Sequence, residues 1–166
     1  MSKPSHRRRA SRTGGGSAST FLDAEARHDF GHGWSGTLTG RRGWTDFAGG
    51  KFQTGAYGFD LAKLGVLSKA DSIGLRIAQP LRVEHGGVAM MLPTSYDYST
   101  GIATDTLSRL SLTPSGREVD AELSYGASLL DGNAWLGANL FYRRQPGHIA
   151  SLPDDKGAAI RFSLGF

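Results

Sequence analysis

The fold class of this chain is decided by the stretch VDAELSYGASL, residues 119–129. Its odd positions carry Val, Ala, Leu, Tyr, Ala and Leu, and its even positions carry Asp, Glu, Ser, Gly and Ser. Successive side chains of a β-strand point to opposite faces, so a strict period of two predicts a strand with one apolar and one polar face.

The same alternation recurs along the chain from Thr20 onward. The alternating segments are residues 22–30, 34–41, 56–61, 72–83 and 158–166. The pattern predicts about eight or nine strands of roughly nine to twelve residues, longer than the roughly five or six residues of typical soluble strands. Pro80 interrupts one of these segments and removes a donor from the ladder, so a bulge or the rim of a barrel is expected there.

Turn signals rich in glycine, proline, asparagine and aspartate separate the segments. They are Gly31–Gly33, Ala48–Gly50, His85–Gly87, Pro114–Gly116, Asp131–Asn133 and Pro153–Asp155. Connections this short hold no crossover helix, so neighbouring strands are expected to pair antiparallel. Residues 60–68 have weak helical spacing, but a strand end followed by a turn is the preferred prediction.

Composition and charge exclude several classes of protein. The chain has 166 residues and no cysteine, which excludes disulfides, thiolate metal sites and cysteine nucleophiles. Its formal charge is +4, but the cations Lys3, Arg7, Arg8, Arg9 and Arg12 fall in the first dozen residues and the rest is near neutral. The body of the protein is therefore not a basic surface built for nucleic acid. No stretch approaches the roughly 18 to 20 apolar residues of a membrane-spanning helix.

The chain is expected to divide at its beginning. Residues 1–19 combine a basic cluster with a glycine-serine run, which predicts a disordered tail. No apolar core follows the arginines, so the sequence carries no recognisable secretory signal. Residues 20–166 are predicted to form one β-domain.

Alternation alone leaves two assignments of the faces open. In a soluble β-sandwich the apolar face points inward, whereas in a membrane barrel it meets lipid and the polar face lines the lumen. Long strands favour the barrel, and so do aromatic residues near strand ends, where an interfacial girdle would lie. Those aromatic residues are Trp34, Trp44, Tyr96, Tyr98, Trp135, Phe141 and Tyr142. The polar face carries both signs of charge, and the predicted lumen network comprises Arg76, Arg82, Glu118, Asp120, Glu122, Arg143 and Arg161.

The end of the chain alternates as well and stops on an aromatic residue. Ile160, Phe162, Leu164 and Phe166 occupy every second position. This pattern resembles the C-terminal recognition strand of Gram-negative outer-membrane β-barrels. The resemblance implies an antiparallel up-and-down barrel, recognition of this strand by the barrel-assembly machinery, and contact with outer-membrane lipid.

Three longer stretches are similar to the C-terminal region of autotransporter-type proteins, in particular the segment that follows a subtilisin-like serine peptidase. They are residues 72–83, 112–123 and 139–150. The resemblance implies a type V secretion translocator, an outer-membrane anchor that lets an N-terminal passenger polypeptide reach the cell surface. The family barrel has twelve strands and a signal peptide. We therefore expect either a truncated C-terminal part of such a protein, without the catalytic passenger, or a smaller barrel that closes alone.

The motifs of the sequence predict no catalytic residue, cofactor or metal site in this chain. Residues 33–37, GWSGT, break the G-x-S-x-G pattern of a nucleophile elbow at its last position. His28 and His32 are interpreted as surface or turn residues, Gln145–His148 as a loop, and Asp154–Lys156 as a solvated turn. Glu118, Asp120 and Glu122 are expected to pair with arginines rather than to serve as acids or bases.

Two alternatives to the translocator stay open. One is an outer-membrane barrel enzyme acting on lipids, for which Ser95 or Ser99 would need to pair with His85 or His148. The other is a soluble β-sandwich that serves as a binding module.

Overall fold

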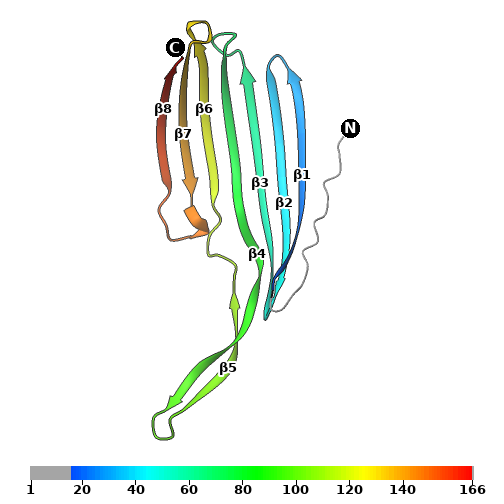
Figure 1. The fold of residues 1–166 in the computed structure, drawn as a ribbon, viewed down its shortest axis with the longest axis vertical. Helices are drawn as coiled ribbons and strands as arrows, with labels where there is room; N and C mark the ends of the chain where they lie inside the picture. The colour runs from blue at the N-terminus through cyan, green and yellow to red at the C-terminus, as the bar shows by residue number, and fades with distance from the viewer. Residues whose placement is uncertain (1–15, 166) are drawn as a thin grey trace. The chain divides into compact units, whose positions relative to one another are not determined.

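The computed structural model describes residues 16–165 and shows an all-β fold, as the alternation predicts (Figure 1). Its strands are β1 Ala18–Gly31, β2 Trp34–Phe47, β3 Gly50–Leu64, β4 Asp71–Asp97, β5 Ile102–Ser111, β6 Val119–Leu129, β7 Ala134–Arg144 and β8 Asp155–Leu164. Most of the tail predicted for residues 1–19 lies outside the described residues, as does Phe166, and β1 already begins at Ala18.

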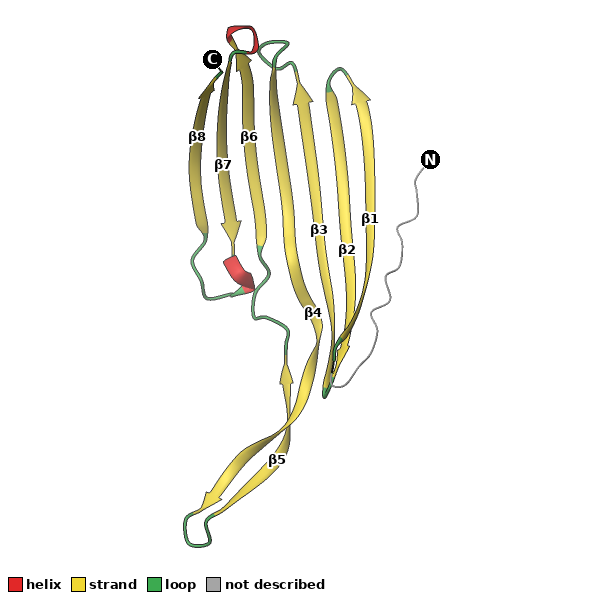
Figure 2. Ribbon diagram, in the orientation of Figure 1, coloured by secondary structure: helices red, strands yellow, loops and turns green. Residues whose placement is uncertain are grey.

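Helical structure in the described part of the chain is confined to two three-residue 3₁₀ turns, Leu130–Gly132 and Pro146–His148 (Figure 2). Neither has the length or the hydropathy that a membrane-spanning helix requires. The weakly helical residues 60–68 form the end of β3 and a turn, which confirms the preferred prediction.

The strands form one antiparallel up-and-down sheet with the order β1-β2-β3-β4-β6-β7-β8. β5 stands off this path and pairs with β4. Among the described residues β1 and β8 are the two ends of the path, so the sheet is open there. Hairpin connections as short as the two residues between β1 and β2 explain the antiparallel order.

The chain divides into two compact units, and β4 contributes to both. Among the described residues, the first unit comprises residues 16–22, Arg42–Gly55 and Val83–Thr113, and the second comprises Asp23–Arg41, Ala56–Arg82 and residues 114–165. In the first unit, β4 pairs with β5 from Gly87↔Ser111 to Asp97↔Ile102, with a register shift between Pro93 and Ser95. In the second unit, β4, β6, β7 and β8 form continuous antiparallel ladders.

One predicted turn is wrong, because His85–Gly87 lies inside the unbroken strand β4. Gly86 has φ 131°, and a Cβ there would overlap the Lys51 carbonyl oxygen. The glycine therefore permits a close backbone approach between β3 and β4 rather than a chain reversal. An irregularity is expected at Pro80. The ladder between β4 and β6 ends two residues before it, at Ala78.

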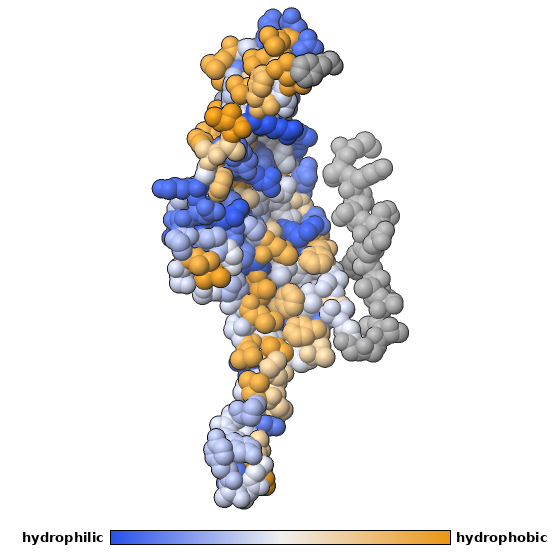
Figure 3. Space-filling model, turned by 60° about the vertical axis from the view of Figure 1, so that its left-hand side comes forward, coloured by the Kyte–Doolittle hydropathy of each residue, from blue (hydrophilic) through white to orange (hydrophobic). Residues whose placement is uncertain are grey.

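Cross-strand pairs place apolar residues together on one face of the second unit. Two of its rows run Ile73-Tyr125-Ala138-Ile160 and Leu75-Leu123-Leu140-Ala158. Nothing in the described residues covers this face, since Leu123 is 42% exposed, Phe162 57% and Ile160 80%. Ala127 and Ala134 are the only buried apolar residues among residues 16–165. Figure 3 shows apolar side chains open on the molecular surface.

Two residues of the predicted aromatic girdle, Trp135 and Phe141, lie on the polar face instead. Trp135 stands opposite Ser128 and Ser163, and Phe141 stands opposite Glu122 and Gly157. Each ring covers a glycine, because a Cβ at Gly137 would overlap the Trp135 ring and one at Gly157 would overlap the Phe141 ring. Glycines on this face thus make room for aromatic rings, which shield the bare backbone.

Candidate functional site

The strongest polar cluster of the second unit centres on Arg143 of β7. The register pairs Arg143 with Asp120 of β6, and Glu118 precedes that strand by one residue. The Arg143 Nε atom lies 3.1 Å from Glu118 Oε1 and 3.1 Å from Asp120 Oδ1. Arginine is always charged and carries several donors, so it joins two carboxylates that would otherwise repel each other.

His148 ties the loop between β7 and β8 to this cluster. The residue is 9% exposed, with Nδ1 accepting the backbone N–H of Glu118 at 2.9 Å and Nε2 lying 3.1 Å from the Leu81 carbonyl oxygen. An acceptor role for Nδ1 puts the proton on Nε2, which then donates to Leu81. The neutral imidazole therefore satisfies one backbone donor and one backbone acceptor at once.

Left-handed backbone conformations bring His148 to this position. Gln145, Gly147 and His148 have φ values of 51°, 66° and 60°. Such values are uncommon outside glycine and need support from the surrounding structure. The support includes the Gly147 N–H, which donates to Glu118 Oε2 at 2.5 Å.

A second set of contacts holds the loop between β5 and β6. Arg82 donates from Nε to the Gly116 carbonyl at 2.8 Å and from a terminal nitrogen to the Pro114 carbonyl at 3.1 Å. The Arg117 side chain donates to the amide oxygen of Gln79, which is only 2% exposed. The backbone N–H of Arg117 also donates to Gln145 Oε1 at 2.7 Å. Two loops far apart in sequence are thus fixed to one patch of the polar face.

The structure brings together only part of the predicted lumen network. Glu118, Asp120 and Arg143 meet as expected, whereas Arg82 donates hydrogen bonds to backbone carbonyls of the loop before β6.

The remaining members of the predicted network lie in other rows of the sheet. A terminal guanidinium nitrogen of Arg76 lies 3.5 Å from Asp60 Oδ1. Arg76 stands opposite Glu122 in the register, and Glu122 accepts a hydrogen bond from Asn139. Arg161 stands opposite Gly137, six residues along β7 from Arg143.

Four residues that contribute polar contacts to this face, His148, Gln79, Asp60 and Asn139, are absent from the predicted network. Asp60 lies in the alternating segment 56–61, so its parity was an available signal. The role of His148 depends on a left-handed loop for which the sequence offers no periodic signal.

Asp71, the first residue of β4, organises the turn before that strand at the opposite end of the second unit. Its carboxylate accepts the backbone N–H groups of Val66, Leu67 and Ser68 at 2.7, 2.9 and 3.0 Å. The Tyr125 hydroxyl donates to the same carboxylate at 3.0 Å. Burial raises the pKa of Asp71, but these hydrogen bonds outweigh the burial and leave the pKa below its ordinary value.

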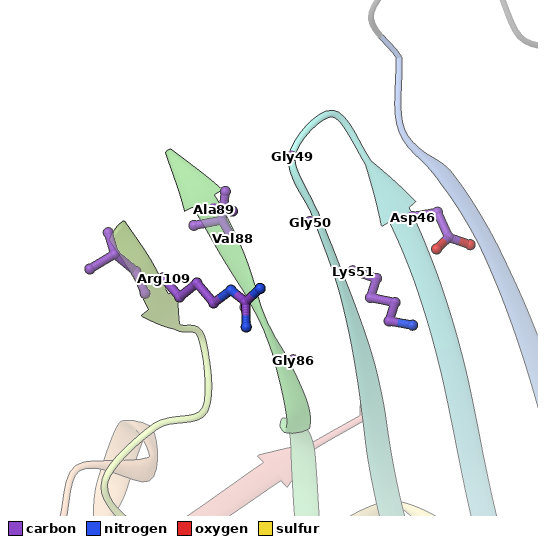
Figure 4. Close-up of a pocket in the computed structure, with 10 residues that line it drawn as sticks. Asp46, Gly49, Gly50, Lys51, Gly86, Val88, Ala89 and Arg109 are labelled. Atoms are coloured by element: carbon purple, nitrogen blue, oxygen red, sulfur yellow. The ribbon is translucent and has the colours of Figure 1, made fainter. Parts of the chain in front are cut away.

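The first unit contains an open hollow of about 430 Å³ between the β2–β3 turn and the β4–β5 ladder (Figure 4). Its glycines, Gly49, Gly50, Gly86 and Gly87, expose backbone, and Asp46, Lys51 and Arg109 supply the charge. The backbones approach closely here, since the Ala89 N–H donates to the Gly49 carbonyl at 2.8 Å.

The serine and histidine candidates for lipid hydrolysis in the first unit do not come together. His85 precedes Ser95 by ten residues on β4, which corresponds to roughly 30 Å along an extended strand. The Ser99 hydroxyl donates to Asp97 at 2.7 Å rather than to a histidine. In the second unit, both ring nitrogens of His148 contact backbone groups.

The other titratable candidates take local roles. His28 packs edge-on against Phe30 at 4.7 Å, and His32 lies in the β1–β2 turn. Asp154 accepts a hydrogen bond from the Tyr142 hydroxyl, and Asp155 begins β8. No group of three or more metal-ligating side chains gathers within residues 16–165.

The C-terminal strand carries its predicted pattern on the face described above. Phe162 and Leu164 stand opposite Leu136 and Ala134 of β7, and Ile160 stands opposite Ala138. The fourth predicted residue of this set, Phe166, lies outside the described residues.

Comparison with protein-family models, with curated proteins and with solved structures finds no match to this chain.

The first prediction concerns His148. His148→Ala removes the acceptor of the buried Glu118 N–H and places alanine at a positive φ, so we expect a loss of about 1–3 kcal/mol in unfolding free energy. His148→Asn should recover part of this loss, because asparagine tolerates positive φ and offers an amide oxygen. Urea unfolding followed by tryptophan fluorescence measures both variants.

The control is His28→Ala, a change at an exposed histidine, which should stay within about 0.5 kcal/mol of the parent. Equal midpoints for the parent and His148→Ala would contradict the role assigned to His148.

The second prediction concerns pH. The pKa of Asp71 is lower in the folded state than in the unfolded state. At pH values above the unfolded-state pKa of about 3.9, the ionised carboxylate therefore stabilises the fold. This stabilisation is lost as the pH falls through the folded pKa. Asp71→Asn should therefore unfold at lower urea than the parent at pH 7, and the difference should narrow at acid pH. A difference independent of pH from 7 to the acid limit would refute the assignment.

Proposed function

We propose that this chain forms wall strands of an outer-membrane β-barrel, with its apolar face toward lipid and its polar face toward an enclosed lumen. The observation that carries the proposal is the uncovered apolar face of the second unit, where residues such as Leu123 and Ile160 remain exposed. A sheet normally packs its apolar face against a second layer. A bilayer supplies the same cover for a sheet that is one layer thick.

Strand length supports this placement. β6 and β7 have 11 residues each and β8 has 10. A tilted strand needs about 9–11 residues to cross the hydrocarbon core. In β4 the ladder to β6 runs from Asp71 to Ala78, and Asp71 at the start of the strand holds the turn before it.

The polar face also suits a lumen. Charges of both signs pair within it, as between Arg143 and the carboxylates of Glu118 and Asp120. Aromatic rings over Gly137 and Gly157 fill space on the same face. Small barrels fill their interior with side chains in this way.

The alternatives fit the geometry less well. A soluble sandwich needs an apolar core, yet Ala127 and Ala134 are the only buried apolar residues in the described part of the chain. A lipid-hydrolysing barrel needs a serine beside a histidine, and Ser99 bonds instead to Asp97.

Within this proposal the chain acts as an anchor and translocator rather than as an enzyme. The resemblance of residues 72–83, 112–123 and 139–150 to autotransporter C-terminal regions supports that role. The partners are then outer-membrane lipid, the barrel-assembly machinery acting on β8, and a passenger polypeptide joined at the N-terminal side. The place of action is the outer membrane of a Gram-negative bacterium.

The third prediction compares two neighbouring positions on β6. Leu123→Arg places a charge on the lipid face and should cost about 2–4 kcal/mol at the bilayer midplane. Ser124→Arg places the same side chain on the lumen face and should cost far less. Urea unfolding from phosphatidylcholine vesicles measures both changes. A chain that stays in buffer when offered vesicles, or equal costs for the two variants, would contradict the lipid-facing assignment.

The fourth prediction tests translocation. A secretory leader and an epitope are fused ahead of Met1, and the fusion is expressed in a Gram-negative host. We expect the chain in the outer-membrane fraction and the epitope open to protease added to intact cells. If the chain is in the outer membrane but the epitope is protected in intact cells, the anchor role stands and the translocator role is refuted. Recovery in the soluble periplasmic fraction would overturn both.

A further inference from the structure

The loop between β7 and β8 is held to the rest of the second unit by contacts that converge on His148 (Figure 2). Nδ1 of the ring accepts the Glu118 N–H at 2.9 Å, and Nε2 lies 3.1 Å from the Leu81 carbonyl oxygen. The backbone carbonyl of the same residue accepts the Gly116 N–H at 2.7 Å. One residue thus joins the loop both to β4 and to the segment that precedes β6.

Neighbouring backbone contacts close the same seam between the two loops. The Gly147 N–H donates to Glu118 Oε2 at 2.5 Å, and the Ala150 N–H donates to the Ser115 hydroxyl at 3.2 Å. The two backbones also approach closely, since a Cβ at Gly116 would lie 2.7 Å from the Ala150 nitrogen. These contacts form together only while residues 145–150 stay against residues 115–118.

Only the neutral form of the His148 ring fits these contacts. Nδ1 faces an N–H donor, so it must offer a lone pair, and the single ring proton then lies on Nε2, where it meets a carbonyl oxygen. A second proton on Nδ1 would point at the Glu118 N–H and set two donors against each other across 2.9 Å. His148 is only 9% exposed, so water does not replace the lost acceptor while the loop stays closed.

The carboxylates that face this end of the unit are matched by the arginine of β7. Glu118 Oε1 and Asp120 Oδ1 each lie 3.1 Å from the Arg143 Nε atom. The other oxygen of Glu118 accepts the Gly147 N–H, and Asp155 of β8 stands opposite Arg143 in the register. Arg143 therefore offsets the negative charge that would otherwise favour a protonated ring.

Two further arginines bring positive charge to the same two loops. Arg82 of β4 donates to the carbonyls of Gly116 and Pro114 at 2.8 and 3.1 Å. The Arg117 side chain donates to the amide oxygen of Gln79. A charge gained by the ring would meet these guanidinium groups, so protonation adds like-charge repulsion to the lost hydrogen bond.

We infer that His148 is a proton-operated latch, which holds the β7–β8 loop against residues 115–118 when its ring is neutral and releases the loop when the ring is protonated. Histidine is the side chain that ordinarily changes charge between pH 5 and 8. The closed loop binds fewer protons than the open one, so its stability falls as the pH drops below about 6.5, where an exposed imidazole titrates. The inference is independent of the proposed membrane placement, because every contact of the latch lies within the second unit.

The test measures hydrogen exchange of the full chain in neutral detergent micelles, in peptides that cover residues 114–118 and 145–152. Protection factors divide out the ordinary pH dependence of exchange. If the closed loop excludes the second proton, these factors should fall about thirtyfold between pH 7.5 and pH 5. Residues 119–129 of β6 serve as the internal reference and should keep their protection. Loop protection that is unchanged over this range would overturn the inference.

Three variants identify the group that takes up the proton. His148→Asn keeps an acceptor for the Glu118 N–H and cannot titrate, so its loop protection should not depend on pH. Glu118→Gln keeps an acceptor for the Gly147 N–H and should retain the response of the parent, as should the control variant His28→Asn, which removes an exposed histidine. A response that survives in His148→Asn, or that disappears in Glu118→Gln, would assign the proton elsewhere and overturn the inference.

A measurement on the parent chain decides the question even if His148→Asn does not fold. Nitrogen-15 NMR of the imidazole should show Nδ1 unprotonated at pH 7.5, and its protonation should coincide with the loss of loop protection. A proton on Nδ1 at pH 7.5, or a doubly protonated ring in a loop that remains protected, would refute the latch.

Discussion

The stability of this sheet depends on what covers its one apolar face. Burying a leucine-sized side chain yields roughly 1.5–3 kcal/mol, and ordering each backbone residue costs about 1–2 kcal/mol. Cross-strand hydrogen bonds contribute only about 1 kcal/mol each in net terms. A sheet whose buried apolar residues are two alanines among those described leaves the larger gain unrealised. In the placement proposed above, a bilayer would supply that cover over a continuous surface.

The polar face meets the opposite requirement, because its charges and backbone groups need partners wherever water is scarce. Arg143 joins Glu118 to Asp120, and His148 links the backbone of Glu118 to that of Leu81. These groups are partly exposed, since the Arg143 side chain is 42% exposed and that of Asp120 30%. Here they fix the loop after β7 against the strands, which defines one end of the polar face.

Period-two alternation located six of the eight strands, and residues 119–129 form β6 with the predicted bounds. No alternating segment was identified for β5 or β7. The turn prediction failed at Gly86. There the absence of a side chain permits a close approach to β3 rather than a reversal of the chain. Trp135 shows a different limit. The parity of Ala134 and Leu136 placed it on the polar face, but its position near a strand end suggested a girdle. The contacts of His148 follow from positive φ angles in its loop, and no local pattern predicts those angles.

The medium that surrounds the apolar face also sets the cost of leaving the strand edges unpaired. In water an unpaired strand edge is hydrated and its cost is small. In hydrocarbon each unpaired backbone group costs several kcal/mol, so a lipid-facing sheet cannot leave β1 and β8 unpaired. Lipid contact on the face would therefore demand partners for the outer edges of β1 and β8, the two ends of the strand path. Conversely, stable and hydrated edges would place the apolar face in water, where no layer of the described chain covers it.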